Sequence, residues 1–148
     1  MADAADEDAD RESEGTDDAL AYMIARVNRR LEEELARRLR PDGVPIEQFR
    51  ILSALGRKGP QTMGALAADA LVERPTLTKI IDRMAAAGLV FRRPDDQDRR
   101  RIHIVMAPEG EALWAELEAV SAAQERELAD RLDDGRTRAL RALLRELS

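Results

Sequence analysis

Apolar residues in the first part of the chain recur at intervals of three and four, which places them on one face of a helix. The first such stripe runs from Leu20 to Leu39. Asp17 or Asp18 is suited to cap its start, and Pro41-Asp42-Gly43 ends it. The pattern predicts a long amphipathic helix whose apolar face needs to be covered.

Three shorter helices are predicted between residues 46 and 88, with turn-forming residues between them. The first covers residues 46–57 and is broken by Gly59-Pro60, after which Thr62 suits the N-cap of the next helix. Pro75 fits the start of the third helix and Gly88 its C-terminal stop. The expected buried stripe of this third helix consists of Leu77, Ile80, Ile81 and Met84. Its opposite face carries Pro75, Thr78, Lys79, Asp82 and Ala86, with Thr76 and Arg83 at the edges.

After Gly88 the pattern changes from helical to alternating. Residues 89–93 indicate a strand, and residues 94–98 indicate a turn. Residues 101–106 alternate as a return strand does, with Ile102, Ile104 and Met106 on one side. The prediction is a β-hairpin with arginines at its tip and just behind it.

The last 40 residues are again helical in pattern. Pro108 opens a long helix, Asp133-Asp134-Gly135 interrupts it, and a terminal helix follows. The apolar stripe of this terminal helix consists of Leu140, Leu143, Leu144 and Leu147. Because these helices are thin and rich in alanine, we expect them to bury their stripes, together with the first helix, against a second copy of the chain.

Two short helices joined by a tight turn and followed by a hairpin form a winged helix-turn-helix, whose second helix enters the major groove of DNA. The predicted fold class is therefore mainly α with a small β-hairpin wing. We expect a disordered acidic tail over residues 1–18, an N-terminal dimerisation helix over 19–45, a DNA-binding domain over 46–107 and C-terminal dimerisation helices over 108–148.

The net charge of −6 at first argues against a nucleic-acid partner. Residues 1–18 hold nine acids and one base, however, so this segment carries −8 and residues 19–148 carry +2. Eight bases against four acids lie between Arg74 and Arg101, in the third short helix and the hairpin. The acidic balance therefore allows a DNA partner, and the tail is expected to compete with phosphates for the bases.

Composition narrows the function classes further. The chain has no cysteine and one histidine, which excludes disulfides and thiolate metal sites, so we expect no metal and no cofactor. It offers no cysteine nucleophile, no evident serine partner for His103 and no glycine-rich loop after a strand, so an enzyme is not expected. No apolar run approaches the length of a membrane span, and the acidic start is unlike a signal peptide, which predicts a cytoplasmic protein.

Residues 76–110, "TLTKIIDRMAAAGLVFRRPDDQDRRRIHIVMAPEG", resemble the signature of the MarR family of bacterial transcriptional regulators. The match includes the hydroxyl-rich start of the recognition helix, the "GLV-RR" junction, the "D-x-R" wing tip and the "PEG" opening of the next helix. The wider resemblance runs from about residue 20 to the end of the chain. It implies a homodimer, a palindromic DNA site and often a small ligand that lowers the affinity for DNA.

The resemblance also implies which residues contact DNA. Arg100 matches the residue that enters the minor groove, and Asp98 matches the carboxylate that would hold its guanidinium. Ala107 stands where the family often has a capping threonine, and Arg101 adds a base where a small residue is common. The full set of expected DNA contacts is Arg74, Pro75, Thr76, Thr78, Lys79, Arg83, Asp98, Arg99, Arg100 and Arg101.

Asp82 lies among these bases on the expected DNA-facing surface. It can pair along the helix with Lys79 or accept a hydrogen bond from the amino group of a cytosine. The residues leave both roles open.

The predicted function is a dimeric, sequence-specific transcriptional regulator, in the form of a repressor relieved by a small effector. The absence of cysteine excludes a thiol switch and favours an organic anion or aromatic acid as the effector. Tyr22, Arg26, Phe49 and Trp114 are the candidate effector-binding residues. The alternative is a helical protein–protein interaction module whose winged fold does not bind DNA.

Overall fold

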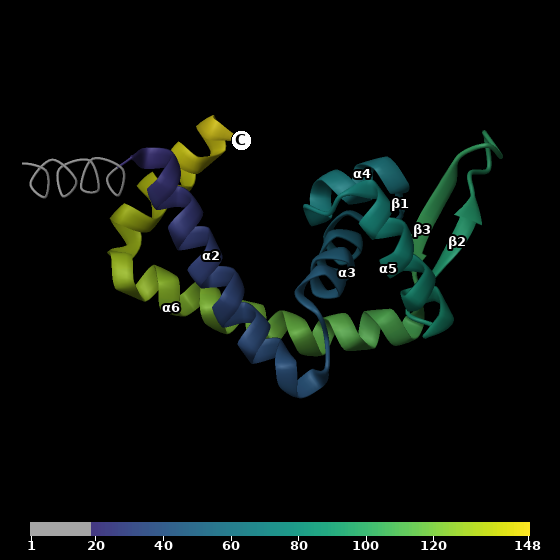
Figure 1. Cartoon of the computed structure of the whole chain (residues 1–148), viewed down its shortest axis with the longest axis horizontal. Coiled ribbons are helices and arrows are strands. Elements are labelled where there is room, and N and C mark those ends of the chain that lie inside the picture. The colour runs from purple at the N-terminus through teal and green to yellow at the C-terminus, as the bar shows by residue number, and fades with distance from the viewer. Residues whose placement is uncertain (1–18) are drawn as a thin grey trace, which may run out of the picture. The chain divides into compact units, whose positions relative to one another are not determined.

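The structure is a computed structural model that describes residues 19–148 (Figure 1). The expected acidic tail and the expected N-cap at Asp17 or Asp18 lie outside the described residues. The rest of the chain forms two units that join between Arg37 and Arg38. The helix α2, Leu20–Leu39, supplies the described part of the first unit and ends where the sequence predicts. A short 3-10 helix, Arg40–Asp42, then leads to Gly43, whose φ of 67° is readily adopted only by glycine.

The three predicted short helices are confirmed in the second unit. They are α3, Ile46–Lys58, α4, Met63–Ala70, and α5, Arg74–Ala86. Thr62 caps α4 as predicted, because its Oγ1 accepts a hydrogen bond from the backbone nitrogen of Ala65 at 3.4 Å. Pro75 lies in the first turn of α5, and Gly88, with φ of 74°, follows its last residues. The two helices of the helix-turn-helix are therefore α4 and α5.

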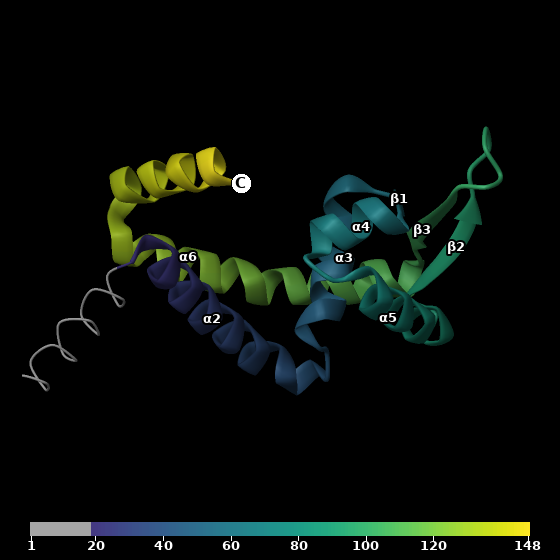
Figure 2. The same ribbon diagram turned by 45° about the horizontal axis from the view of Figure 1, so that its top comes forward.

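The core of the second unit lies between α3, α4, α5 and the first part of the last helix. The predicted stripe of Leu77, Ile80, Ile81 and Met84 is buried, which confirms the face assignment of α5. α5 packs against α4 and strand β2, and α3 packs against α4, strand β3 and α6 (Figure 2). Leu66 of α4 and the apolar stripe of α5 are thus covered within one copy of the chain, whereas Leu71 in the turn between the two helices is 76% exposed.

The sheet has three strands, whereas the sequence analysis predicted only a hairpin. Strands β2, Val90–Pro94, and β3, Ile102–Met106, form the predicted wing. A short strand β1, Gln61–Thr62, pairs antiparallel with the other edge of β3, giving the order β1-β3-β2. The prediction missed β1 because two residues before a helix cap carry no alternating pattern.

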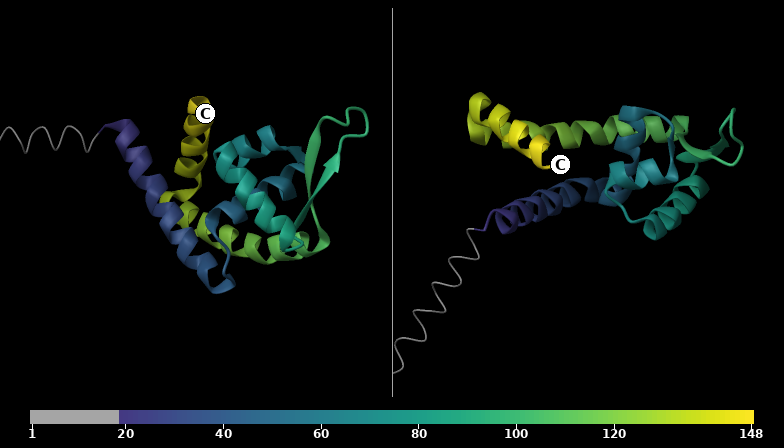
Figure 3. Two further views of the ribbon diagram at one scale, coloured as in Figure 1. Left: turned by 45° about the vertical axis from the view of Figure 1, so that its right-hand side comes forward. Right: turned by 90° about the horizontal axis from the view of Figure 1, so that it is seen from above.

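The alternation predicted for β3 holds at its centre and weakens toward its tip. Ile104 is fully buried, whereas Ile102 is exposed because the hairpin extends beyond the helices there (Figure 3). Cα pairing aligns Arg92 with Ile104 and Arg93 with His103. Paired residues of adjacent strands share a face, so Arg92 lies on the inner face with Ile104, and Arg93 lies on the outer face with His103.

The last helix, α6, runs from Pro108 to Leu147 and contains one non-helical residue, Asp133, with φ of 61° and ψ of 168°. The interruption predicted at residues 133–135 is thereby confirmed. Near the start of α6, Gly110 lies so close to the carbonyl oxygen of Leu89 that a Cβ atom would collide with it. None of the helices in residues 19–148 is long and apolar enough to cross a bilayer.

Candidate nucleic-acid interface

The solvent-facing side of α5 gathers the residues that the sequence predicted there. Arg74, Pro75, Thr76, Thr78, Lys79, Asp82, Arg83 and Ala86 are all exposed. This surface therefore presents basic and hydroxyl groups along one side of the helix. Such groups suit phosphate oxygens and the base edges of a major groove.

Local contacts orient two side chains at the start of α5. The hydroxyl of Thr78 donates to the carbonyl oxygen of Arg74 at 3.1 Å, which leaves its oxygen lone pairs directed outward. The guanidinium of Arg74 lies over Gly64 of α4, at a position that any Cβ atom on residue 64 would occupy. The absence of a side chain at Gly64 thus lets Arg74 lie across the first turn of α4.

Asp82 pairs with the wing rather than with its own helix. Its Oδ1 accepts a hydrogen bond from Nη2 of Arg92 in β2 at 2.6 Å. Of the two roles left open for Asp82, the structure shows a third partner in place of Lys79, because the chain folds β2 against α5 and brings Arg92 within reach. The charge of Asp82 is consequently balanced by a base that belongs to another element.

The tip of the wing is ordered by two carboxylates. Oδ1 of Asp95 accepts hydrogen bonds from the backbone nitrogens of Gln97 at 2.8 Å and Asp98 at 3.1 Å. Oδ1 of Asp98 accepts one from the backbone nitrogen of Arg100 at 3.1 Å. The resemblance implied that Asp98 holds the guanidinium of Arg100, whereas the contact in this structure is to its backbone. The carboxylate therefore shapes the turn that presents Arg99, Arg100 and Arg101, all of which are exposed.

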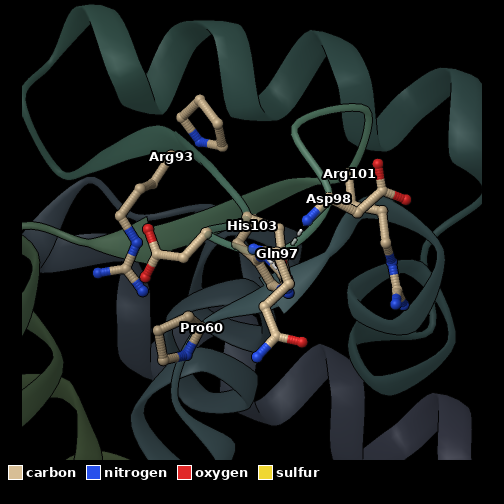
Figure 4. A pocket seen from close by; sticks show the side chains of 9 residues that line it. Pro60, Arg93, Gln97, Asp98, Arg101 and His103 are labelled. Atoms are coloured by element: carbon tan, nitrogen blue, oxygen red, sulfur yellow. Dashed lines mark hydrogen bonds and ion pairs between the residues drawn. The ribbon is translucent and has the colours of Figure 1, made fainter.

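These backbone hydrogen bonds lower the pKa of Asp95 below its usual value, and the nearby side chains of His103 and Arg101 lower it further. Oδ2 of Asp95 lies 3.6 Å from Nδ1 of His103. Figure 4 shows the shallow pocket of about 680 Å³ that these residues line together with Pro60 on the outer side of the wing, with Arg93 and Arg101 on opposite sides of His103. Among residues 19–148, no cluster of histidine and carboxylate groups could hold a metal ion.

The candidate effector residues do not share one pocket. Tyr22 and Arg26 belong to α2 in the first unit. Phe49 lines a pocket of about 360 Å³ between α3 and α4. Trp114 lines a separate pocket of about 350 Å³ and packs against Gly56. The four-residue effector site remains a prediction.

Comparison with known proteins identifies the family. A model of the MarR family matches residues 42–101, which cover most of the helix-turn-helix and the wing. An HTH-type transcriptional regulator of Mycobacterium tuberculosis is 31% identical over 117 residues, which make up 79% of this chain and 80% of that protein. The chain belongs to the MarR family.

A further relative and a solved structure are also similar to this chain. The homoprotocatechuate degradative operon repressor of Escherichia coli is 37% identical over 68 residues, 46% of each protein, so the match spans about half of that relative. Among solved structures, NadR in complex with 4-hydroxyphenylacetate superposes with a TM-score of 0.79 at 27% identity, covering 87% of this chain and 92% of that one. With relatives that are transcriptional regulators and repressors, this MarR-family chain is a DNA-binding transcriptional regulator.

One residue of this MarR-family interface escaped the sequence analysis. Arg92 was predicted only as part of a strand and of the "GLV-RR" junction, although it faces α5 and binds Asp82. The alternation of β2 contained the signal, because Val90 and Arg92 must share a face and Val90 is buried.

Proposed function

We propose that this protein is a homodimeric repressor that binds a palindromic operator and is released by a small aromatic or organic acid. The observation that carries the proposal is the exposed surface that α5 and the wing share, where the bases of residues 74–101 gather. In this proposal α5 lies in the major groove, and Arg100 enters the neighbouring minor groove, whose negative potential favours arginine. As a bacterial-type transcriptional regulator, the protein acts in the cytoplasm in this proposal.

The proposal assigns dimerisation to the two ends of the chain. Leu20, Met23 and Val27 on α2 are exposed, and so are Leu143 and Leu147 at the end of α6. Exposed apolar residues at helical spacing are typical of surfaces that pack against a partner. We therefore propose that residues 19–45 and 108–148 contact a second copy, and that residues 46–107 form the DNA-binding domain between them.

The effector part of the proposal rests on the pocket between α3 and α4. Phe49 contributes an aromatic side chain to this pocket, and Arg50, Arg57 and Lys58 line it together with Asp69, which pairs with Lys58 at 2.7 Å. An apolar floor with a basic rim suits a small aromatic acid, the class of ligand in the NadR structure. Addition of 4-hydroxyphenylacetate is expected to raise the melting temperature and to weaken DNA binding. No shift with a panel of aromatic acids would contradict this part.

DNA binding itself is tested by the salt dependence of the affinity and by one substitution. Several phosphate contacts should make log K fall steeply with log salt concentration. Arg100→Ala is expected to weaken binding at least about tenfold, which corresponds to about 1.4 kcal/mol. Arg126→Ala removes the same charge from an exposed position on α6 and serves as the matched control. Footprinting upstream of the protein's own gene should show two half-sites about one helical turn apart.

The rival function, a protein–protein module without DNA binding, predicts a different outcome. It requires that wild-type protein show no salt-dependent affinity for duplex DNA and that Arg100→Ala behave like the wild type. Absence of salt-dependent binding by the wild type would overturn the DNA-binding proposal, whereas unchanged binding by Arg100→Ala alone would overturn the assignment of Arg100 to the minor groove.

A further inference from the structure

The ion pair between Asp82 and Arg92 joins the recognition helix to the wing. Oδ1 of Asp82 and Nη2 of Arg92 are 2.6 Å apart, and the two side chains are 60% and 41% exposed. Their contact is thus open to solvent on the surface that carries Thr78 and Lys79 of the same helix. An exposed pair of this kind contributes little to folding stability, so its position calls for a functional explanation.

Strand pairing determines on which side of the wing Arg92 lies. Arg92 is aligned with Ile104, which is fully buried, and so projects from the inner face toward α5. Arg93, its neighbour in sequence, is aligned with His103 and lines the pocket on the outer face. Two adjacent arginines of one strand therefore occupy opposite faces, and only Arg92 approaches the recognition helix.

We propose that Arg92 contacts the phosphate backbone that separates the two grooves, and that Asp82 is the positioning residue that holds its guanidinium there. The proposal rests on the proposed function, in which α5 and the wing enter adjacent grooves. The DNA strand between those grooves must then pass the junction of helix and wing, which is where Arg92 lies. A guanidinium has five N–H donors, so the bond to Asp82 leaves others for a phosphate.

The role of Asp82 follows from the same geometry. A free arginine samples many rotamers and loses that freedom when it binds a phosphate. An arginine already held by a carboxylate has lost part of it before DNA arrives, which favours binding. If Asp82 did not position Arg92, its negative charge would only repel the phosphates. Positioning and repulsion therefore predict opposite signs for the removal of this charge.

The test measures the affinity of full-length variants for a mixed-sequence DNA duplex over a series of salt concentrations. Arg92→Gln is expected to weaken binding about tenfold and to reduce the slope of log K against log salt by about one unit per protomer. Asp82→Asn is expected to weaken binding about threefold, because Arg92 is no longer oriented. In the Arg92→Gln background, Asp82→Asn should instead strengthen binding, because only repulsion is left to remove.

Two controls separate this proposal from general effects of charge. Arg93→Gln removes the same charge from the outer face and should leave the salt slope within about 0.3 of the wild type. Asp130→Asn removes one acid from α6 and should change neither slope nor affinity. Stronger binding by Asp82→Asn in the wild-type background, or equal slopes for Arg92→Gln and Arg93→Gln, would overturn the proposal. Absence of DNA binding by the wild type would instead overturn the proposed function.

Discussion

The helix-turn-helix and the end of α6 differ in how far their apolar residues are buried. In the helix-turn-helix, Leu66, Leu77 and Ile81 are fully buried by neighbouring elements of the same chain. At the end of α6, Leu143 is 57% and Leu147 is 67% exposed. The two regions have similar apolar spacing in sequence. Only in the helix-turn-helix are these apolar residues buried within a single copy of the chain.

This difference separates two kinds of stability. A core formed within one chain has a free energy that does not depend on protein concentration, whereas apolar surface that packs against a partner is stabilised by mass action. In the proposed dimer the same helix takes part in both, since Leu117 of α6 is buried in the core while Leu143 is exposed. Substitutions in the core, in the terminal stripe and at the bend between them test whether the two regions are stabilised in these different ways.

The largest effect is expected for Ile81→Ala in the core. Ile81 is fully buried beneath the exposed side of α5, so its truncation leaves a cavity. Such substitutions cost about 2–5 kcal/mol of unfolding free energy. Urea denaturation followed by circular dichroism should show this loss to the same extent at every protein concentration. A loss below about 1 kcal/mol would indicate that α5 is not part of a tight core.

Leu143→Asp is expected to have the next largest effect, and a concentration-dependent one. A charge on the terminal stripe opposes burial against a second copy. Sedimentation should then detect monomers, and affinity for a two-site DNA should fall at least about tenfold because bivalent binding is lost. Ala142→Asp places the same charge on the opposite side of the helix and should change neither. Unchanged sedimentation of Leu143→Asp would remove this stripe from the proposed interface.

The elements that the sequence predicted well are those whose periodicity is long and clearly bounded. The stripe of α5 spans four buried residues between Pro75 and Gly88, and both its face and its limits are confirmed. The exposed side of α5 was predicted with it, because the two faces of a helix are complementary. The family resemblance then added the wing residues that periodicity could not assign.

The features that the sequence did not reveal depend on contacts between distant residues. Strand β1 consists of two residues and exists only because β3 offers a free edge. For Asp82, pairing with Lys79 along the helix was one of two roles left open, and the packing of β2 on α5 supplies Arg92 as its partner. Asp98 was expected to bind the guanidinium of Arg100, but in the tight turn its carboxylate accepts a hydrogen bond from the backbone nitrogen of Arg100. In each case tertiary packing or turn geometry determines the partner. The spacing of residues in the sequence does not predict these contacts.

The smallest effect is expected at the bend of α6, where Asp133 adopts a backbone conformation that is essentially reserved for glycine. Asp133 also caps the terminal segment, because its Oδ1 accepts a hydrogen bond from the backbone nitrogen of Arg136 at 3.0 Å. Asp133→Ala retains the strain and loses the cap, at a cost of about 1 kcal/mol. Asp133→Gly loses the cap but relieves the strain, so it should be the more stable of the two.

Amide hydrogen exchange can locate this loss. In Asp133→Ala, the amide hydrogens of residues 136–147 should exchange faster than in the wild type. The bend separates these residues from the core around Leu117, so the loss of stability should be confined to them. Amides of α5 should exchange as in the wild type. If the amides of α5 and of residues 136–147 lost protection together, the two regions would open as one unit. The terminal stripe would then owe its stability to the core rather than to a partner.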